Sequence, residues 1–300
     1  MHKFKLYLTE IRAPFFTASV LPILLGTAIA WHYTHVIHWP YFFLALVGGV
    51  ALHAGTNIAN DYFDHLSGND AANTEYIRPF TGGSRLIQKG LLKPIEVLLE
   101  SLAFFALGIL VGFYFLWVYG WPIFWIGVIG VFSGFFYTAP PFKLGYRGVG
   151  ELVVGLNFGI LMTLGAYLVQ TGELAWAPVI AALPLALLIV AVLYANQFPD
   201  YQADKVVGKR HLVVLLGRER AVWGYMALLL IAYFLIIASV LWWGMPVYAL
   251  IILFTMPIAY RAATVLRKNF ASPLLLAPTS GATIALHMLF GGLLVLAYIL

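Results

Sequence analysis

The 300-residue chain contains no cysteine, and only 10% of its residues are charged. The lack of cysteine excludes disulfides, thiol nucleophiles and cysteine metal sites. Soluble domains carry about 25% charged residues. The low share of charge, together with 62% hydrophobic residues, therefore argues against a soluble protein. In a chain this apolar the formal charge of +5 is not a nucleic-acid signature. The composition therefore predicts an integral membrane protein with no nucleic-acid partner.

Long apolar segments with few charges recur along the chain. Each is close to the length that a helix needs to cross about 30 Å of hydrocarbon. We therefore expect an all-α integral membrane fold with nine transmembrane helices. The segments cover residues 14–32, 41–60, 95–118, 121–138, 150–170, 175–198, 221–243, 245–266 and 275–300.

The charged residues gather on one side of the predicted membrane. If the segments alternate in direction, 16 of the 17 Lys and Arg residues fall in the connections on that side, which the positive-inside rule makes cytoplasmic. Eleven of the twelve acidic residues, all but Glu173, lie there too. Topology needs only Lys and Arg, so the carboxylates indicate chemistry at that face. We expect a multi-pass protein of the cell (plasma) membrane, with its N-terminus and active site cytoplasmic.

The second segment ends in the run NIANDYFDHLSGND, residues 57–70. Asn57, Asp61 and Asp64 are spaced i, i+4 and i+7, so on a helix they share one face. Like charges at this spacing repel each other, and a divalent cation would remove the conflict. Mg²⁺ prefers carboxylate oxygens and keeps positions open for phosphate and water. An ordinary solvated helix end is the alternative.

A similar motif ends the sixth segment, where Asn196, Asp200 and Asp204 are spaced i, i+4 and i+8. Its first Asp lies 139 residues after the first Asp of the earlier motif, and its last Asp lies 140 after the last. An even number of spans separates the two motifs, so both face the same side. We therefore predict one metal-binding pocket in a single domain of 300 residues with two pseudo-equivalent halves, about 14–138 and 150–266.

Basic residues follow both motifs and also occur in a third connection of the same side. Carboxylates, Mg²⁺ and cationic side chains together describe a diphosphate site. The run Gly82-Gly83-Ser84 before Arg85 suits close backbone approach to an anion. Topology alone is the alternative for many of these cations. The candidates are Arg78, Arg85, Lys89, Lys143, Arg147, Lys205, Lys209 and Arg210.

A diphosphate site at a membrane face indicates a lipid diphosphate, whose hydrocarbon would lie between the helices. Loss of diphosphate would ionise an allylic C–O bond, and an electron-rich acceptor would capture the carbocation. Aromatic rings near the charged motifs could stabilise that cation. The tyrosines at these places are Tyr62, Tyr137, Tyr146, Tyr194 and Tyr201.

With NDYFD at 60–64, DYQAD at 200–204 and nine expected spans, the chain resembles the UbiA superfamily of intramembrane prenyltransferases. The resemblance covers nearly the whole chain. It implies nine helices around a central cavity with cytoplasmic cap loops, and Mg²⁺-dependent transfer of a polyprenyl group from its diphosphate. It implies metal ligation by Asp61, Asp64, Asp200 and Asp204, assisted by Asn57 and Asn196, with catalytic roles for these aspartates, Lys143 and Tyr137. It implies substrate contacts by Asn57, Asn60, Arg78, Arg85, Lys143, Asn196, Lys205, Lys209, Tyr146 and Tyr201.

Three runs are similar to the branch of the family that prenylates 1,4-dihydroxy-2-naphthoate in menaquinone synthesis. They are NDYFDHLSGND with the later TGGSR, YTAPPFKLGYRGVGE, and DKVVGKRHLVVLLG. Many family members carry an acidic residue four positions after the second Asp of the first motif. Here that position is Gly68, and Asp70 comes two later. The resemblance implies an aromatic acceptor, prenylated with loss of CO₂ to give demethylmenaquinone. Enzymes for 4-hydroxybenzoate, homogentisate or a glycerol lipid share most of these motifs and are the alternative.

Two other classes compete with prenyl transfer. Transporters also have pseudo-repeats and acidic residues, but their binding sites lie near the middle of the membrane, whereas these carboxylates lie at one face. An alcohol phosphotransferase would also use Mg²⁺, but its DGxxAR pattern does not occur. The expected partners are therefore a polyprenyl diphosphate, an aromatic acceptor and membrane lipid. Nothing in the sequence indicates an obligatory protein partner.

Overall fold

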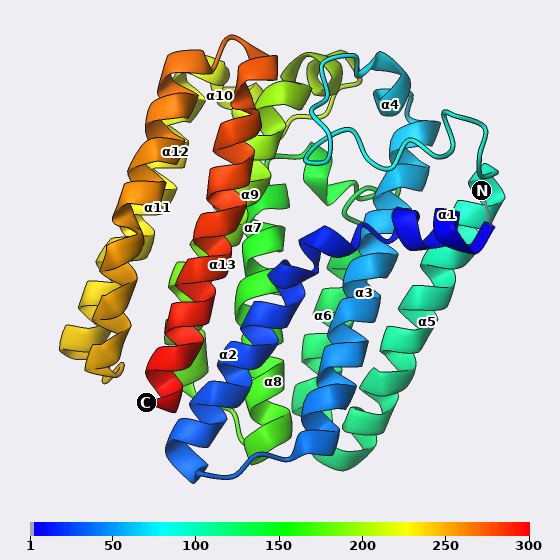
Figure 1. Cartoon of the computed structure of the whole chain (residues 1–300). Helices are drawn as coiled ribbons and strands as arrows, with labels where there is room; N and C mark the ends of the chain where they lie inside the picture. The colour runs from blue at the N-terminus through cyan, green and yellow to red at the C-terminus, as the bar shows by residue number, and fades with distance from the viewer. Residues whose placement is uncertain (1–2) are drawn as a thin grey trace.

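The computed structural model describes residues 3–300, in which the regular elements are helices and no strand occurs. Eight of the helical segments are long and apolar enough to cross a membrane (Figure 1). This confirms the predicted all-α membrane fold. The elements of these segments are α1 (Lys3–Glu10), η1 (Ala13–Phe16) and α2 (Thr17–Thr34); α3 (Trp39–Leu66); α5 (Pro94–Tyr119); α7 (Gly150–Gly155), η3 (Leu156–Leu161) and α8 (Met162–Thr171); α9 (Trp176–Val206); α11 (Arg218–Trp242); η4 (Val247–Thr255) and α12 (Met256–Asn269); and η5 (Pro273–Leu276) and α13 (Ala277–Ile299).

The fourth predicted span, residues 121–138, is a shorter helix in the structure. Helix α6 (Trp121–Phe135) has 15 residues, which at about 1.5 Å per residue gives a length of about 22 Å. The chain turns after Phe135, ahead of Pro140 and Pro141, neither of which can donate a helical hydrogen bond. Gly120, at a positive φ of 70°, joins α5 directly to α6, as expected for a tight hairpin. Among residues 3–300 the bundle therefore has eight long helices and one short one.

Two helices continue beyond their apolar segments and carry the acidic motifs with them. Helix α3 runs to Leu66, and α9 passes through Pro199 and ends at Val206. Pro199 removes one backbone donor, yet the helix continues, as prolines in membrane helices often allow. The four motif aspartates therefore stand on rigid helix ends and not on loops.

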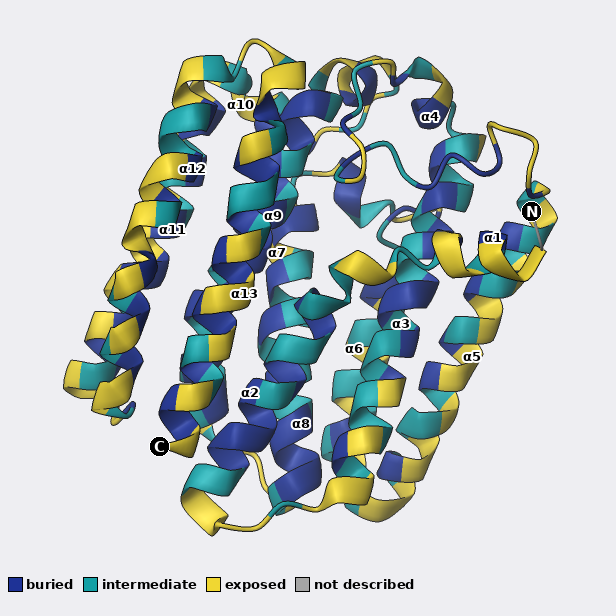
Figure 2. Cartoon of the chain, in the orientation of Figure 1, coloured by how far each residue is buried: buried dark blue, intermediate teal, exposed yellow. Residues whose placement is uncertain are grey.

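The outer surface of the bundle is apolar, as expected for contact with lipid. Figure 2 shows exposed positions along the outer faces and buried positions toward the middle of the bundle. Large side chains such as Trp117 and Phe254 are more than 80% exposed. Helix packing in lipid depends on close contact between helices and not on a hydrophobic drive. A Cβ at Gly159 would lie 2.3 Å from Cβ of Ala186, so this glycine lets η3 approach α9.

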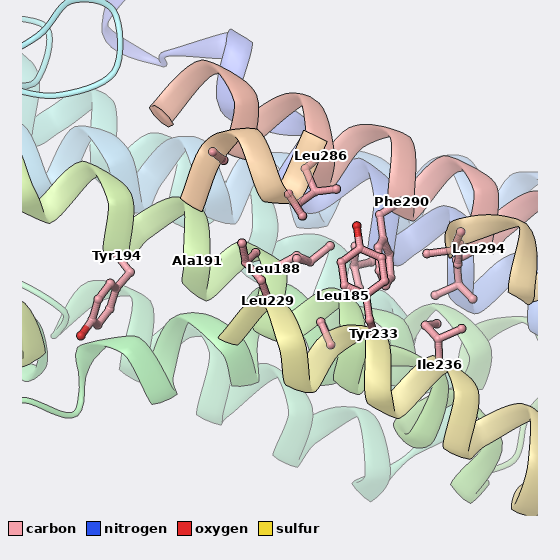
Figure 3. Packing of buried hydrophobic residues seen from close by; sticks show 14 of the residues in the cluster. Leu185, Leu188, Ala191, Tyr194, Leu229, Tyr233, Ile236, Leu286, Phe290 and Leu294 are labelled. Carbon is pink, nitrogen blue, oxygen red and sulfur yellow. The ribbon is translucent and has the colours of Figure 1, made fainter. Parts of the chain in front are cut away.

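The largest buried cluster joins α9, α11 and α13 (Figure 3). Leu185 and Leu188 of α9 pack there with Tyr233 of α11 and Phe290 of α13. The rings of Tyr233 and Phe290 lie 5.7 Å apart, and the Tyr233 hydroxyl bonds Thr255 Oγ1 at 2.7 Å. This packing holds α9 firmly and so positions the second acidic motif.

The loops that carry most of the charge cover one end of the bundle. Helices α4 (Asn69–Ala72) and α10 (Leu212–Leu216) lie there, at the top of Figure 1, and the C-terminus lies toward the other end. Helix α1 runs across the bundle near the covered end, and Lys3 Nζ donates to Glu96 Oε1 of α5 at 2.7 Å. We call the loops and short helices that cover this end the cap. The acidic ends of α3 and α9 meet under it.

Candidate functional site

A cavity of about 370 Å³ lies inside the bundle. Along α3 its lining runs from Ala45 to Asp64, a distance of about 28 Å at about 1.5 Å per residue. The charged lining residues belong to the ends of α3 and α9 and to the cap, whereas most of the remaining lining is apolar or glycine. The cavity is therefore a long apolar chamber with one charged end.

The structure brings both acidic motifs to this charged end. Nine of the fifteen predicted site residues line the cavity, and the aspartates are largely buried. The two motifs thus meet at one pocket, as the sequence predicted. The roles of the individual residues stay predictions. The nine are Asn57, Asn60, Asp61, Asp64, Tyr137, Asn196, Asp200, Asp204 and Lys209.

Lys209 connects the two motifs. Its Nζ lies 3.2 Å from Asp64 Oδ2 and 3.7 Å from Asp204 Oδ1. Burial by itself would lower the pKa of Lys209, but Asp64 and Asp204 hold that pKa well above its ordinary value. A charged ammonium therefore stands between one carboxylate of each motif.

The aspartates of α9 are held by side chains that follow the first motif. Asn73 Nδ2 donates to Asp200 Oδ1 at 2.7 Å, and Asn69 Nδ2 donates to Asp204 Oδ1 at 3.0 Å. His211 Nε2 lies 2.8 Å from Asp204 Oδ2. Asp204 thus has three partners, counting Lys209, and is the most firmly held of the four aspartates.

The aspartates of α3 contact the cap in a different way. The backbone N–H of Ser84 donates to Asp61 Oδ2 at 2.6 Å, and Arg12 Nη1 lies 3.8 Å from Asp61 Oδ1. A Cβ at Gly83 would lie 2.7 Å from Asp61 Oδ1, and its φ is +65°. The glycine run therefore lies close to the Asp61 carboxylate, while its predicted approach to a substrate anion stays a prediction. Asp64 Oδ1 accepts from the Tyr146 hydroxyl at 3.0 Å.

The donor set fits magnesium held partly by its substrate. Among residues 3–300 no three Asp, Glu or His side chains are close enough to hold a metal by themselves. Mg²⁺, however, is usually bound by one or two carboxylates together with substrate phosphates and water. Five buried amide oxygens of residues that line the cavity at or beside the acidic motifs have no hydrogen-bond partner within the described chain, which is unusual for buried polar atoms. They are Oδ1 of Asn60, Asn69, Asn73 and Asn196 and Oε1 of Gln197.

Six predicted residues lie outside the cavity lining. Arg85 donates to the carbonyls of Asp70 and Asn73, the latter at 2.7 Å, and Arg78 donates to the carbonyl of Ser84 at 2.6 Å. Both arginines therefore brace the cap loop that carries the partners of the aspartates. The other four form two cation–aromatic pairs. Lys143 Nζ lies 5.2 Å from the centre of the Tyr146 ring, and Lys205 Nζ lies 5.8 Å from the centre of the Tyr201 ring.

Several residues of the charged end were not predicted from the sequence. Asn69, Asn73 and His211 contact the aspartates, and Arg12 lies beside Asp61. Helices α3 and α9 end at Leu66 and Val206, so helical spacing from the motifs does not extend to these residues, and only their proximity in sequence to the motifs or to a basic run could have signalled them. Asp70 also lines this end, and its Oδ2 accepts from Gln88 Nε2 at 2.6 Å.

Comparison with known proteins agrees with this architecture. The chain is 30% identical over 225 residues to 1,4-dihydroxy-2-naphthoate octaprenyltransferase of Bacillus subtilis, covering 75% of this chain and 70% of that protein. It is 32% identical over 252 residues to the protein of the same name from Mycobacterium tuberculosis, covering 84% and 82%. A UbiA homologue from Archaeoglobus fulgidus, solved with DMAPP and Mg²⁺, has the same fold, with a TM-score of 0.61, 17% identity and coverage of 96% and 98%.

The family assignment rests on the greater part of the chain. Residues 19–277 match the UbiA prenyltransferase family, a range that contains both acidic motifs and six of the eight long helical segments in full. The matches at 30–32% identity cover more than two thirds of the length of each relative. With the two acidic helix ends at one end of an intramembrane cavity, the chain belongs to the UbiA prenyltransferase family.

Proposed function

We propose that the protein transfers a polyprenyl group from an allylic polyprenyl diphosphate to 1,4-dihydroxy-2-naphthoate, with loss of CO₂, in a Mg²⁺-dependent reaction that yields demethylmenaquinol, the hydroquinone form of demethylmenaquinone. The observation that carries the proposal is the long cavity with one charged end. Its shape and polarity match a substrate with a charged head and a long apolar tail.

The charged end would hold the diphosphate. Asp61 and Asp64, with Asp200 and Asp204, would bind Mg²⁺ together with the unpartnered amide oxygens, and Lys209 and Arg12 are the cations that line this end. Bound Mg²⁺ would neutralise charge on the leaving diphosphate. The cap covers this end, so it limits access of water to the carbocation, which water would otherwise capture.

The apolar part would hold the prenyl tail. A Cβ at Gly112, Gly127 or Gly130 would meet no atom within 4 Å, so these glycines leave open space in the wall of the cavity. Tyr137, which lines the cavity next to the charged end, presents an aromatic ring that could stabilise a developing cation. The tail would thus extend away from the diphosphate between α5 and α6.

The acceptor assignment draws on the relatives named above. The bond between C1 of the prenyl group and the diphosphate oxygen breaks, and C1 bonds to the ring carbon that carries the carboxylate. The carboxylate then leaves as CO₂, and its electron pair restores the aromatic ring. We further propose the plasma membrane as the location, with the charged end and the N-terminus on the cytoplasmic side, since the basic loops lie at that end.

The test is transfer by the purified protein in lipid, with Mg²⁺, an allylic polyprenyl diphosphate and 1,4-dihydroxy-2-naphthoate. We expect a prenylated, decarboxylated product by mass and one CO₂ per product. Product on 4-hydroxybenzoate or homogentisate alone would keep the mechanism and change the acceptor. No transfer to any acceptor by folded protein would contradict the proposal and favour a transporter.

A further inference from the structure

Two polar pairs lie in the otherwise apolar wall of the cavity. His53 of α3 pairs with Ser19 of α2, and Asn157 of η3 pairs with Ser133 of α6. His53, Asn157 and Ser133 all line the cavity. Polar groups within a membrane are costly and usually functional, and the prenyl tail has no polar atom for them to bind. These pairs therefore need a different ligand.

His53 offers a hydrogen-bond donor to the cavity. Its Nδ1 lies 2.5 Å from Ser19 Oγ, which has no other hydrogen-bond partner among residues 3–300. The Ser19 hydroxyl proton has an acceptor in the described chain only if it is donated to Nδ1, and in that tautomer the proton of the neutral ring is on Nε2. Nε2 of His53 has no partner in the described chain, yet it is not among the fully buried atoms, whereas Nε2 of His287 is. The N–H of His53 thus remains available to a ligand.

Asn157 offers the complementary acceptor. The Ser133 hydroxyl donates to the carbonyl of Ile129 at 2.6 Å, so its single proton is used there. Ser133 Oγ also lies 3.1 Å from Asn157 Oδ1, but with its proton on the Ile129 carbonyl it accepts from Asn157 Nδ2 at 2.8 Å, and Oδ1 can then accept from a ligand. Asn157 stands in a π-helical stretch, Leu156–Leu161, and such stretches occur often at functional sites.

The π-helical stretch also places an aromatic ring beside His53. The ring centroids of Phe158 and His53 lie 4.5 Å apart, and Phe16 lies 5.4 Å from His53 on another element. Phe158 lines the cavity next to Asn157. His53 stands one helical turn from Asn57 and two turns from Asp61, about 6 and 12 Å along α3. A planar ring bound here would thus lie beside the place where the prenyl group loses its diphosphate.

We propose that His53 and Asn157 bind the oxygen substituents of the aromatic acceptor. This inference rests on the proposed prenyl transfer and names the residues that select the acceptor. The Nε2–H of His53 donates to a carboxylate or phenolic oxygen, Oδ1 of Asn157 accepts from a ring hydroxyl, and Phe158 packs against the ring. Ser19 and Ser133 are positioning residues that orient these two groups. A donor and an acceptor in the wall of one cavity match a ring that carries both a carboxylate and a hydroxyl.

The test separates the two substrates kinetically in the full-length protein. His53→Phe and Asn157→Leu should each raise KM for the aromatic acceptor by tenfold or more, while KM for the prenyl diphosphate stays within twofold. His53→Gln, which keeps an amide N–H, should recover part of the loss. Ser19→Ala should raise the acceptor KM about threefold, and Ser19→Thr should restore it. His287→Phe is the matched control, since His287 is also buried in a span but does not line the cavity.

Three outcomes would overturn the inference. Unchanged acceptor KM in both His53→Phe and Asn157→Leu would remove both residues from acceptor binding. An equal rise in both KM values would make the effect structural. If the Phe variant does not fold, an unchanged acceptor KM in both His53→Gln and Ser19→Ala would have the same meaning. These outcomes differ from failure of the proposed function, in which the wild-type protein itself transfers nothing. If the wild type prefers another aromatic acid, the same KM comparison applies to that acceptor.

Discussion

The two acidic motifs have nearly the same spacing but different partners. Asp61 and Asp64 of α3 contact a backbone N–H, a tyrosine hydroxyl and Lys209. The aspartates of α9 instead accept from side-chain amides of the segment that follows α3. Lys209, which follows α9, in turn reaches back to Asp64. Each motif thus has at least one partner in the chain that follows the other motif, so the two acidic helix ends depend on each other.

The largest effect should come from removing a carboxylate of either motif. Asp61→Asn and Asp200→Asn keep the side-chain shape and one acceptor oxygen but remove the charge that would hold Mg²⁺. We expect transfer to fall by about 10² to 10³-fold or more, with normal folding in lipid. Glu173→Gln, at the opposite end of the bundle, is the control and should retain full activity. Near-normal activity in Asp61→Asn alone would show that the two motifs are not functionally equivalent.

A smaller effect, on stability, should distinguish Lys209 from Arg12, the two cations beside the aspartates. Lys209→Met leaves Asp64 and Asp204 without their shared counter-charge, and breaking a buried ion pair costs about 3 kcal/mol. Arg12 lies 3.8 Å from Asp61, a long contact without a hydrogen bond, so Arg12→Gln should cost about 1 kcal/mol or less. Thermal unfolding in detergent measures both. Added Mg²⁺ should recover part of the loss in Lys209→Met, and equal losses in the two variants would contradict the comparison.

The sequence predicted the fold and the meeting of the motifs for clear physical reasons. Apolar length gives membrane helices directly, and the even number of spans between the motifs puts Asp61 and Asp200 at one end of the bundle. The fourth predicted segment, residues 121–138, was too long because apolar composition continues past Phe135, where α6 ends. Hydropathy does not detect a turn in an apolar segment.

Side-chain partners across the cap could not be predicted in the same way. Arg85 was expected at the diphosphate, but its guanidinium is used by the carbonyls of Asp70 and Asn73 and by the Tyr76 ring, 4.1 Å away. Asn69 and Asn73 were not singled out, because nothing in their spacing places them over α9. Such contacts depend on how the loop folds back, which is a tertiary property.

The smallest effect should come from Asp70, an acid that has no counterpart after the second motif. Asp70 follows the first motif, whereas Lys205 and Lys209 follow the second. Burial, together with the charges of Asp61 and Asp64, raises the pKa of Asp70 from 3.8 to about 7. An acid whose pKa is higher in the folded protein than in the unfolded chain binds more protons when folded. Its contribution to stability is therefore complete below about pH 3.8 and is lost as the pH rises toward 7.

We therefore expect Tm to fall by a few degrees between pH 5 and pH 8 in the absence of substrate and Mg²⁺. Asp70→Asn should flatten this dependence, because an amide does not titrate and can still accept from Gln88 Nε2. Glu75→Gln is the control, since Glu75 lies in the same cap segment but its side chain is 44% exposed. An unchanged slope in Asp70→Asn would mean that Asp70 is ionised in the folded protein throughout this range. The positive charge of Arg85, which lowers the pKa of Asp70, would then outweigh the effect of burial, which raises it.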